Sequence, residues 1–106
     1  MRAGNLRHRV TVEQNTPTRN SKGEEIDWWA PFGGPRYAAI IPLTGREAFN
    51  AQQRHAEAEI RIEMRYFPGI TTKMHVSFGG RRFDILHIAN IHTRGSETHL
   101  LVKERN

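Results

Sequence analysis

Apolar and polar residues alternate along several stretches of this chain of 106 residues. The clearest stretch runs from Glu57 to Tyr66, where the odd-numbered residues are charged and the even-numbered residues are mostly large and apolar. A period of two residues is typical of a β-strand with one buried and one solvated face. The stretch from Leu6 to Val12 alternates in a similar way. The pattern therefore predicts one strand in each stretch.

Two further strands are predicted to form a tight hairpin. Residues 74–78 and 83–91 flank the pair Gly79-Gly80. Two glycines in this position favour a type I′ turn, because both central residues of that turn need a positive φ. The second strand is apolar on both faces, so we expect it to be covered on both sides. The turn sets the register, with Val76 opposite Phe83 and Met74 opposite Ile85.

Residues 36–43 and 97–103 complete the set of predicted strands, with turns at 67–70 and 93–96. Five or six sequential strands with short turns are typical of an antiparallel architecture. The predicted fold is therefore mainly β, a small antiparallel barrel or sandwich with one short helix and a long loop. We expect residues 1–106 to form a single domain. Its predicted core consists of Ile60, Ile62, Met64, Val76, Phe83, Ile85 and Val102.

The single predicted helix begins at Thr44. The sequence from Thr44 to Glu47 fits a capping box, in which each of the two side chains bonds to the other residue's backbone N–H. A helix of about ten residues should follow. Phe49 is its only large apolar residue, so we expect Phe49 to pin the helix to the barrel and the remaining faces to meet solvent or a neighbouring subunit.

Gln14 to Pro35 is expected to be a long loop, with a short strand near residues 25–29. Structureless loops beyond about 12–15 residues are usually functional or disordered. We expect this loop to be mobile in the free subunit and ordered after assembly. The adjacent Trp28 and Trp29 have three readings: an anchor to the chain's own barrel, an anchor to another subunit, or a stacking surface for bases.

Composition narrows the function. The net charge is +5 and 13 of the 16 basic residues are arginine, dispersed along the chain. Arginine suits protein interfaces and contacts to phosphate backbones. There is no cysteine, no apolar run of membrane-spanning length and no secretory signal pattern at the start. We therefore expect synthesis inside the cell and no membrane partner.

No catalytic or metal-binding motif stands out. None of the six histidines has the HExxH spacing, and no serine lies in a nucleophile motif. We expect His8 and His87 to be satisfied core imidazoles, and His99 to lie opposite Asn90. Carboxylates alternate with arginines on the strand faces and are predicted to form cross-strand ion pairs. The sequence predicts no enzyme, no cofactor and no metal.

Several segments, in their order along the chain, resemble the phage head–tail joining proteins, also called head-completion or stopper proteins. The basic lead at residues 1–10 resembles the opening of that family, and Pro42 to Glu47 followed by Phe49 and Gln52-Gln53 resembles its central signature. Residues 65–74 and 79–83 are similar to a third block. The segment 30–35, Ala-Pro-Phe-Gly-Gly-Pro, is richer in glycine and proline than the family pattern leads us to expect.

The resemblance implies a virion component assembled in the host cytoplasm. It implies a β-barrel that forms a homo-oligomeric ring below the portal or adaptor, closes the DNA-filled head and docks a tail-completion or tail terminator protein. Another connector protein, such as an adaptor or tail terminator, and a non-specific nucleic-acid-binding barrel remain alternatives. Arg19 and Lys22 are candidate contacts to packaged double-stranded DNA. The candidate interface residues are Trp28, Trp29, Arg46, Asn50, Gln53 and Arg54.

Overall fold

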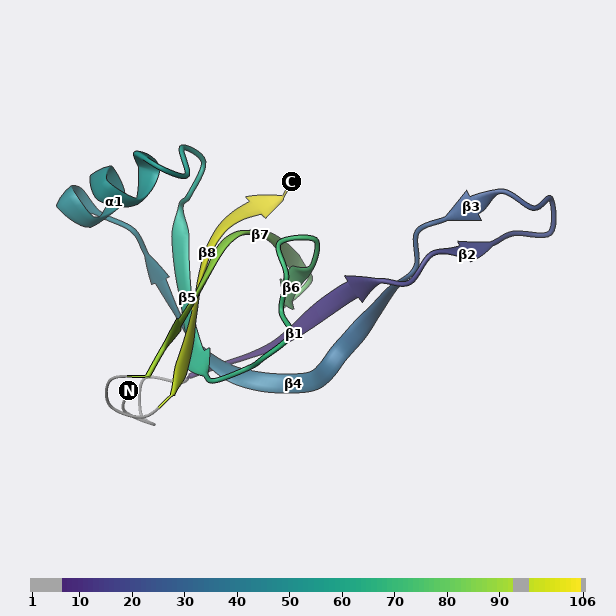
Figure 1. Ribbon diagram of the computed structural model, residues 1–106, viewed down its shortest axis with the longest axis horizontal. Coiled ribbons are helices and arrows are strands. Elements are labelled where there is room, and N and C mark those ends of the chain that lie inside the picture. The colour runs from purple at the N-terminus through teal and green to yellow at the C-terminus, as the bar shows by residue number, and fades with distance from the viewer. Residues whose placement is uncertain (1–6, 93–95, 106) are drawn as a thin grey trace.

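Six antiparallel strands close into a barrel in the computed structural model, which describes residues 7–92 and 96–105. The order around the barrel is β1-β4-β5-β8-β7-β6, and a helix stands beside one end of it (Figure 1). The predicted antiparallel barrel is confirmed. The barrel strands are β1 (His8–Asn15), β4 (Trp29–Pro42), β5 (Ile60–Arg65), β6 (His75–Phe78), β7 (Arg81–Ile91) and β8 (Glu97–Arg105).

The barrel interior holds the residues that the period-two pattern selected. Ile62, Met64 and Phe83 are fully buried, and their charged neighbours in sequence point outward. Of the predicted core only Ile60 is partly buried, packed against the cluster. Leu6 and most of the predicted turn at 93–96 lie outside the described residues. The predicted core omitted six members of the buried cluster: Val10, Val12, Ala38, Phe67, Ile70 and Leu100. It also omitted the buried polar residue Thr98 on β8.

The hairpin between β6 and β7 forms as predicted. Gly79 and Gly80 have φ values of 56° and 80°, as a type I′ turn requires. Val76 pairs with Phe83, which confirms that part of the register. The paired ladder begins at His75 and Asp84, so Met74 lies beyond it.

The prediction that β7 is covered on both sides is wrong. Its register against β8 shifts between Ile85 and His87, so Leu86 is an extra residue. A bulge of this kind exchanges the inward and outward positions beyond it. Ile85 therefore faces the core before the bulge and Ile88 packs against the core after it, while His87 is exposed. The bulge, and not a second covering layer, explains why apolar residues occupy both odd-numbered and even-numbered positions of β7.

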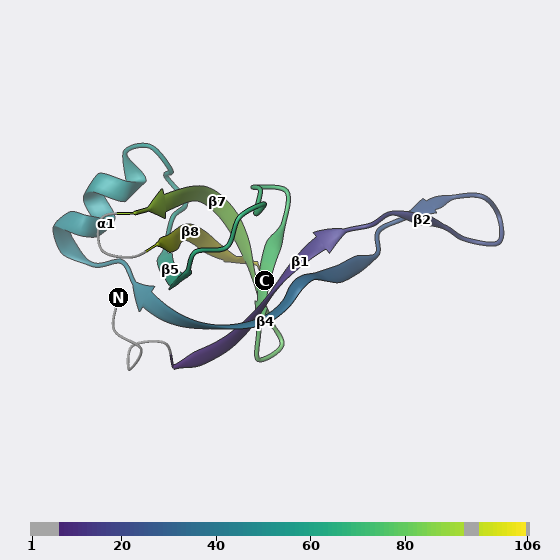
Figure 2. The ribbon, with the colours of Figure 1, turned by 60° about the horizontal axis from the view of Figure 1, so that its bottom comes forward.

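The predicted loop at residues 14–35 is also wrong in its extent. β1 continues to Asn15 and β4 begins at Trp29, and these ends pair with each other. Beyond them, β2 (Thr18–Arg19) and β3 (Glu25–Ile26) continue the ribbon. We call residues 14–30 the arm. It projects away from the barrel in both views (Figures 1 and 2), and the molecule measures 50 × 28 × 24 Å.

Glycine and proline at 31–35 build a bend in β4. From Thr11 to Glu13, two steps along β1 match four steps along β4, from Pro35 to Pro31. Gly33 and Gly34, with φ near 80°, lie in this bulge. β4 pairs with β5 only from Ala38 onward, so the bend lies on an edge, where proline is tolerated. The segment 30–35, which departs from the family pattern, is thus part of a strand that contains a bulge.

Phe67 fills the space under the bend. Its ring stacks on Phe32 with centroids 5.5 Å apart, and the guanidinium of Arg36 lies 4.0 Å from its centroid. A Cβ atom added to Gly33 would come within 2.7 Å of the Phe67 ring. The buried hydroxyl of Thr98 accepts the N–H of Phe67 at 2.8 Å and donates to Asn90. The turn at 67–70 is thereby locked to both β4 and β8.

Helix α1 (Gly45–Gln52) begins where predicted, but the capping box does not form. Thr44 occupies the N-cap without a side-chain hydrogen bond, and Glu47 forms an ion pair with Arg61 on β5 instead. Phe49 is 63% exposed, so it does not pin the helix to the barrel. The helix is held by the Glu47–Arg61 pair and by Gln52, whose amide donates to the carbonyl of Ala58 at 2.9 Å.

Candidate interaction surfaces

The arm is held together by its own polar bonds. At its neck, the Asn15 amide donates to Asp27 at 3.0 Å, and the N–H of Thr16 donates to the carbonyl of Trp28 at 2.7 Å. At its tip, the Asn20 side chain accepts the N–H groups of residues 22 and 24. Residues 15–28 are exposed except for Asn20, which is half-buried. The arm therefore lacks an apolar core of its own.

The two adjacent tryptophans face different surroundings. Trp29 is partly buried and its ring lies 4.1 Å from the ring of His75 on β6. Trp28 is 60% exposed, and Ile26 on the same face of the ribbon is 42% exposed. Trp29 thus anchors the arm to its own barrel, whereas Trp28 has an open face for another molecule.

A buried histidine lies under the base of the arm. His75 is 1% exposed, and its Nε2 lies 2.6 Å from a carboxylate oxygen of Glu13. Its Nδ1 has no hydrogen-bond partner among the described residues. The sequence reasoning missed this group, since His75 has the opposite parity to the core residue Val76. Both parities are buried here because Trp29 covers the outside of β6.

The histidines expected in the core lie elsewhere. His8 is half-buried against Phe78, with ring centroids 5.0 Å apart. His87 is exposed and stacks on His55 at 4.8 Å. His99 pairs with Ala89, one position away from the expected Asn90, whose partner is Thr98. The shift is already present at the turn end of the hairpin, where Ile91 pairs with Glu97.

Helix α1 and the residues that follow it border an open depression. The depression has a volume of about 480 Å³. Three candidate interface residues, Asn50, Gln53 and Arg54, line it with Ala51, His55, His87 and Leu101. Arg46 does not line it. Arg46 and Arg54 have no ion-pair partner among the described residues. The structure therefore brings three of the four candidates in this segment to one hollow.

The candidate DNA contacts Arg19 and Lys22 lie in the tip of the arm. Both are exposed, and Arg19 donates to the carbonyl of Gly23 at 2.9 Å. Glu24, Glu25 and Asp27 follow directly. The arm thus carries a net charge of −1. Since the whole chain carries +5, the rest of the chain carries +6.

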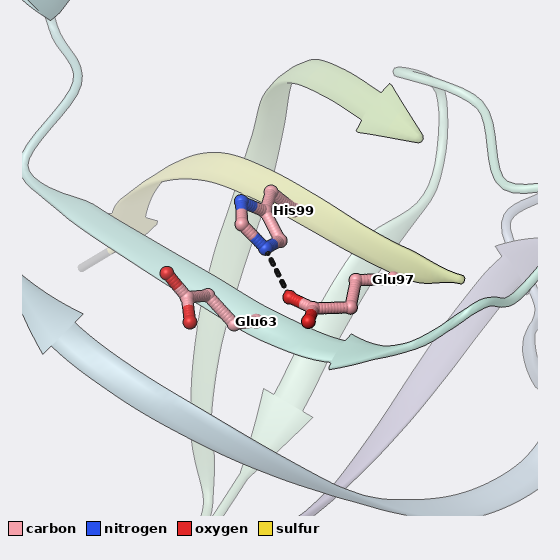
Figure 3. Close-up of side chains that lie close together, drawn as sticks. All are labelled: Glu63, Glu97 and His99. Carbon is pink, nitrogen blue, oxygen red and sulfur yellow. Dashed lines mark hydrogen bonds and ion pairs between the residues drawn. The ribbon is translucent and has the colours of Figure 1, made fainter. Parts of the chain in front are cut away.

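One group of acidic and histidine side chains is close enough to be weighed as a metal site. Glu63 on β5 and Glu97 and His99 on β8 bring ligand atoms within 4.8 Å of one another (Figure 3). Glu97 bonds to His99 at 2.8 Å, and Glu63 bonds to Arg61 at 2.7 Å. The Arg61 guanidinium beside Glu63 disfavours a cation there. Two separate sets of contacts account for the group: the ion pairs of Arg61 with Glu47 and Glu63, and the Glu97–His99 bond.

The predicted cross-strand ion pairs form. Arg81 makes a two-pronged contact with Glu104 at 2.8 and 2.7 Å, and Arg105 pairs with Asp84 at 2.9 Å. The hydrogen bond from Arg81, and then its charge, lower the pKa of Glu104. Lys103 pairs with Glu57 at 3.2 Å. These pairs occupy charges that would otherwise be free for partners.

Serine and imidazole meet at one exposed point, where His92 Nδ1 lies 3.0 Å from the Ser96 hydroxyl. A working nucleophile also needs a third group that orients the base. Within residues 7–92 and 96–105, no carboxylate bonds to the other ring nitrogen of His92. In the same residues, no helix is long and apolar enough to cross a bilayer.

The closed six-stranded barrel, with its projecting arm and thinly attached helix, defines a small β-barrel protein. The family model of the phage head completion proteins matches residues 1–105. The chain belongs to this phage head completion protein family, which confirms the resemblance seen in the sequence. The protein is therefore a structural component of a virion that acts with other virion proteins.

Individual relatives agree with this assignment. Head completion protein gp7 of Enterobacteria phage HK97 is 28% identical over 90 residues, which cover 83% of this chain and 80% of that protein. The solution structure of protein SF1141 from Shigella flexneri 2a has a TM-score of 0.79 at 24% identity, covering 98% of this chain and 96% of that one. A chain of the virion of a native gene transfer agent particle has a TM-score of 0.64 at 16% identity, covering 94% and 96%. The two solved structures support the fold.

Proposed function

We propose that this protein closes the DNA-filled head as a ring of identical subunits below the portal or adaptor, and that the ring offers a docking face to the tail. Each subunit acts through residues 1–106 as one domain and without catalysis. Family membership favours head completion over the roles of adaptor or tail terminator. The packaged DNA is a non-specific neighbour of the ring.

The projecting arm is the observation that carries this proposal. A two-stranded ribbon is at best marginally stable alone in water. This ribbon has an exposed tryptophan and isoleucine, and its outer part rests on no barrel strand of its own chain. Such a surface gains most from a neighbouring molecule. Contacts between unlike surfaces of identical subunits close into rings when the rotation permits.

Helix α1 supplies the second contact of the proposal. Arg46 and Arg54 are free of ion pairs within the described chain, and Asn50, Gln53 and Arg54 border the depression beside the helix. Arginine forms two-pronged bonds with carboxylates and is enriched at interfaces. We assign this face to the head or tail protein that the ring meets. Arg19 and Lys22 remain the proposed contacts to DNA.

The test is electron microscopy of the protein mixed with its portal complex and with DNA-filled heads. The expected result is a ring at the portal vertex and heads that keep their DNA. A variant in which residues 16–28 are replaced by Asn-Gly retains the barrel strands and should leave heads leaky. Heads that retain DNA equally well with and without the protein would refute the proposal.

Binding to free DNA distinguishes the proposed function from the alternative of a nucleic-acid-binding barrel. Binding driven by phosphate contacts weakens steeply as salt rises. Tight, salt-sensitive binding to duplex DNA in the absence of a portal, together with no binding to the portal, would favour that alternative.

A further inference from the structure

The outer wall of the barrel carries a basic and aromatic surface that the proposed function does not use. Arg9 on β1 lies opposite Tyr37 on β4, and Tyr37 and Arg65 on β5 line one shallow hollow of about 220 Å³. All three are exposed, Tyr37 to 60%. Their neighbours Val10, Ala38 and Met64 are fully buried, so strand alternation directs these three side chains outward. We call Arg9, Tyr37 and Arg65 the patch.

Neither arginine of the patch is neutralised within its own chain. Arg9 and Arg65 make no ion pair with any residue of 7–92 or 96–105. Glu97 lies across from Arg65 on β8, but its carboxylate bonds to His99 at 2.8 Å. By contrast, Arg61, Arg81 and Arg105 on the same barrel are all paired. Two free cations therefore flank one exposed aromatic ring.

The arm carries the complementary set. Glu24 and Glu25 have no ion pair within the described chain, whereas Asp27 is bonded to Asn15. Ile26 and Trp28 are the exposed apolar residues beside them. The arm is negative overall, while the rest of the chain is strongly positive. Two free carboxylates next to apolar side chains match two free guanidinium groups beside a tyrosine.

We propose that the arm of one subunit docks on the patch of the next copy of this chain. Glu24 and Glu25 pair with Arg9 and Arg65, and Trp28 or Ile26 packs on Tyr37. The β3 edge of the ribbon lies against the wall formed by β1, β4 and β5, so that side chains from both faces of the ribbon, Glu25 from one and Ile26 from the other, reach the patch. Arm and patch are different surfaces, so the contact is head-to-tail and repeats from copy to copy. This inference rests on the proposed ring and names the two surfaces that build it.

A charge-exchange experiment tests the pairing. The arm variant is Glu24→Arg with Glu25→Arg, and the patch variant is Arg9→Glu with Arg65→Glu. Each replaces two attractions by two like-charge repulsions at the interface, so each should weaken subunit association at the portal by roughly tenfold or more. A chain that carries all four substitutions restores opposite charges and should recover most of the association. Circular dichroism checks that every variant is folded.

The absence of cysteine gives a second measurement. Two single-cysteine proteins, Glu25→Cys and Arg9→Cys, are mixed, assembled on the portal and oxidised. The mixture should give disulfide-linked dimers that neither protein gives alone. A mixture of Glu25→Cys with Gln53→Cys, placed just after helix α1, should not. Efficient linkage to Gln53→Cys would relocate the arm to the depression beside the helix and overturn the proposal.

Three other outcomes also decide the matter. If the wild-type protein forms no ring and retains no DNA, the proposed function itself fails. If rings form and hold DNA normally with either charge variant, the ring stands and the arm–patch contact is wrong. If only the patch variant is defective and the four-fold exchange does not rescue it, the patch contacts phosphate, and a matching loss of salt-sensitive DNA binding would establish that contact.

Discussion

Single residues set the shape of β4. Gly33 and Gly34 both have φ near 80°, a region that costs other residues about 1–2 kcal/mol. They differ in their surroundings. A Cβ atom added at Gly33 would lie 2.7 Å from the Phe67 ring, whereas a Cβ atom added at Gly34 would have no neighbouring atom within 4 Å. Substitutions at these two glycines therefore separate the free-energy cost of a positive φ from the cost of crowding against Phe67.

Gly33→Ala should destabilise the fold more than Gly34→Ala. Both lose the freedom of glycine, but only the first forces the Phe67 ring away from Phe32 and Arg36, at an additional cost of about 1–3 kcal/mol. Denaturant unfolding of the two variants provides the measurement. Equal midpoints would contradict the crowding argument.

Ile62 is a fully buried member of the barrel core. Ile62→Ala should cost about 2–5 kcal/mol, since it leaves a cavity among residues that cannot collapse into it. Ile26→Ala, in the arm, removes the same atoms from a side chain that is 42% exposed, and it should change stability by no more than about 0.5 kcal/mol. An unchanged unfolding midpoint for Ile62→Ala would refute the core assignment.

The base of the arm shows how one element is tied to another. The ring of Trp29 lies against the ring of His75, tilted by 35°, and His75 in turn bonds to Glu13 of β1. The contact therefore couples β4, β6 and β1 at the point where the arm leaves the barrel. An aromatic contact of this kind is worth about 0.5–1.5 kcal/mol beyond the area it buries.

Trp29→Ala should lower the stability of the barrel and speed amide exchange in β1 and β4 near the arm. Trp28→Ala is the matched control. The Trp28 indole is 60% exposed, so its loss should change the stability of the free protein by no more than about 0.5 kcal/mol. The same control should still impair assembly if Trp28 meets a partner. Identical unfolding curves for the two variants would rule out the anchor.

Helix α1 is attached by few contacts and has no buried residue. The double reversal Arg46→Glu with Arg54→Glu should leave the barrel folded, as judged by circular dichroism, and reduce the yield of DNA-filled heads that join tails. Exposed charge pairs are individually weak, which is why two are changed together. Lys73→Glu with Arg82→Glu makes the same change in net charge elsewhere. Normal infectious particles from the helix variant would exclude this face as an assembly surface.

The whole molecule is less compact than its length suggests. Its radius of gyration is 14.9 Å, against about 13 Å for a compact domain of this size. The arm accounts for the difference, and it is joined to the barrel by its base alone. A closed barrel has no free edges, so the exposed strand edges of the described residues are concentrated in the arm and in the adjoining bend of β4.

The arm should exchange its amide protons quickly in the free protein and slowly after assembly. In the free state its hydrogen bonds are exposed to water and little apolar area supports them, which is typical of segments that open at small free-energy cost. Hydrogen exchange by mass spectrometry compares residues 14–30 in the two states, with the β6–β7 hairpin as internal reference. Strong protection in the free protein would contradict the expectation.

The local sequence pattern was sufficient to predict a strand wherever one face of the strand is solvent-exposed and the other is buried. The alternation at residues 57–66 identified β5 and its core residues, and Gly79-Gly80 set the pairing of Val76 with Phe83, because a two-residue turn leaves no other register. The ordered motifs from Pro42 to Phe83 were sufficient for the family. These features depend on neighbours in sequence, so the sequence by itself determined them.

Long-range pairing decided the remainder. Pro31, Gly33 and Pro35 are typical of a loop, yet they belong to a strand because the distant β1 pairs with Pro31 and Pro35, and because Phe67 fills the bend beside Gly33. His75 is buried because Trp29 covers it, and β7 changes its inward face at a bulge against β8. Phe49 is exposed because Arg61 holds the helix through Glu47. In each case the free energy comes from a partner that is distant in sequence, so only the tertiary structure could decide it.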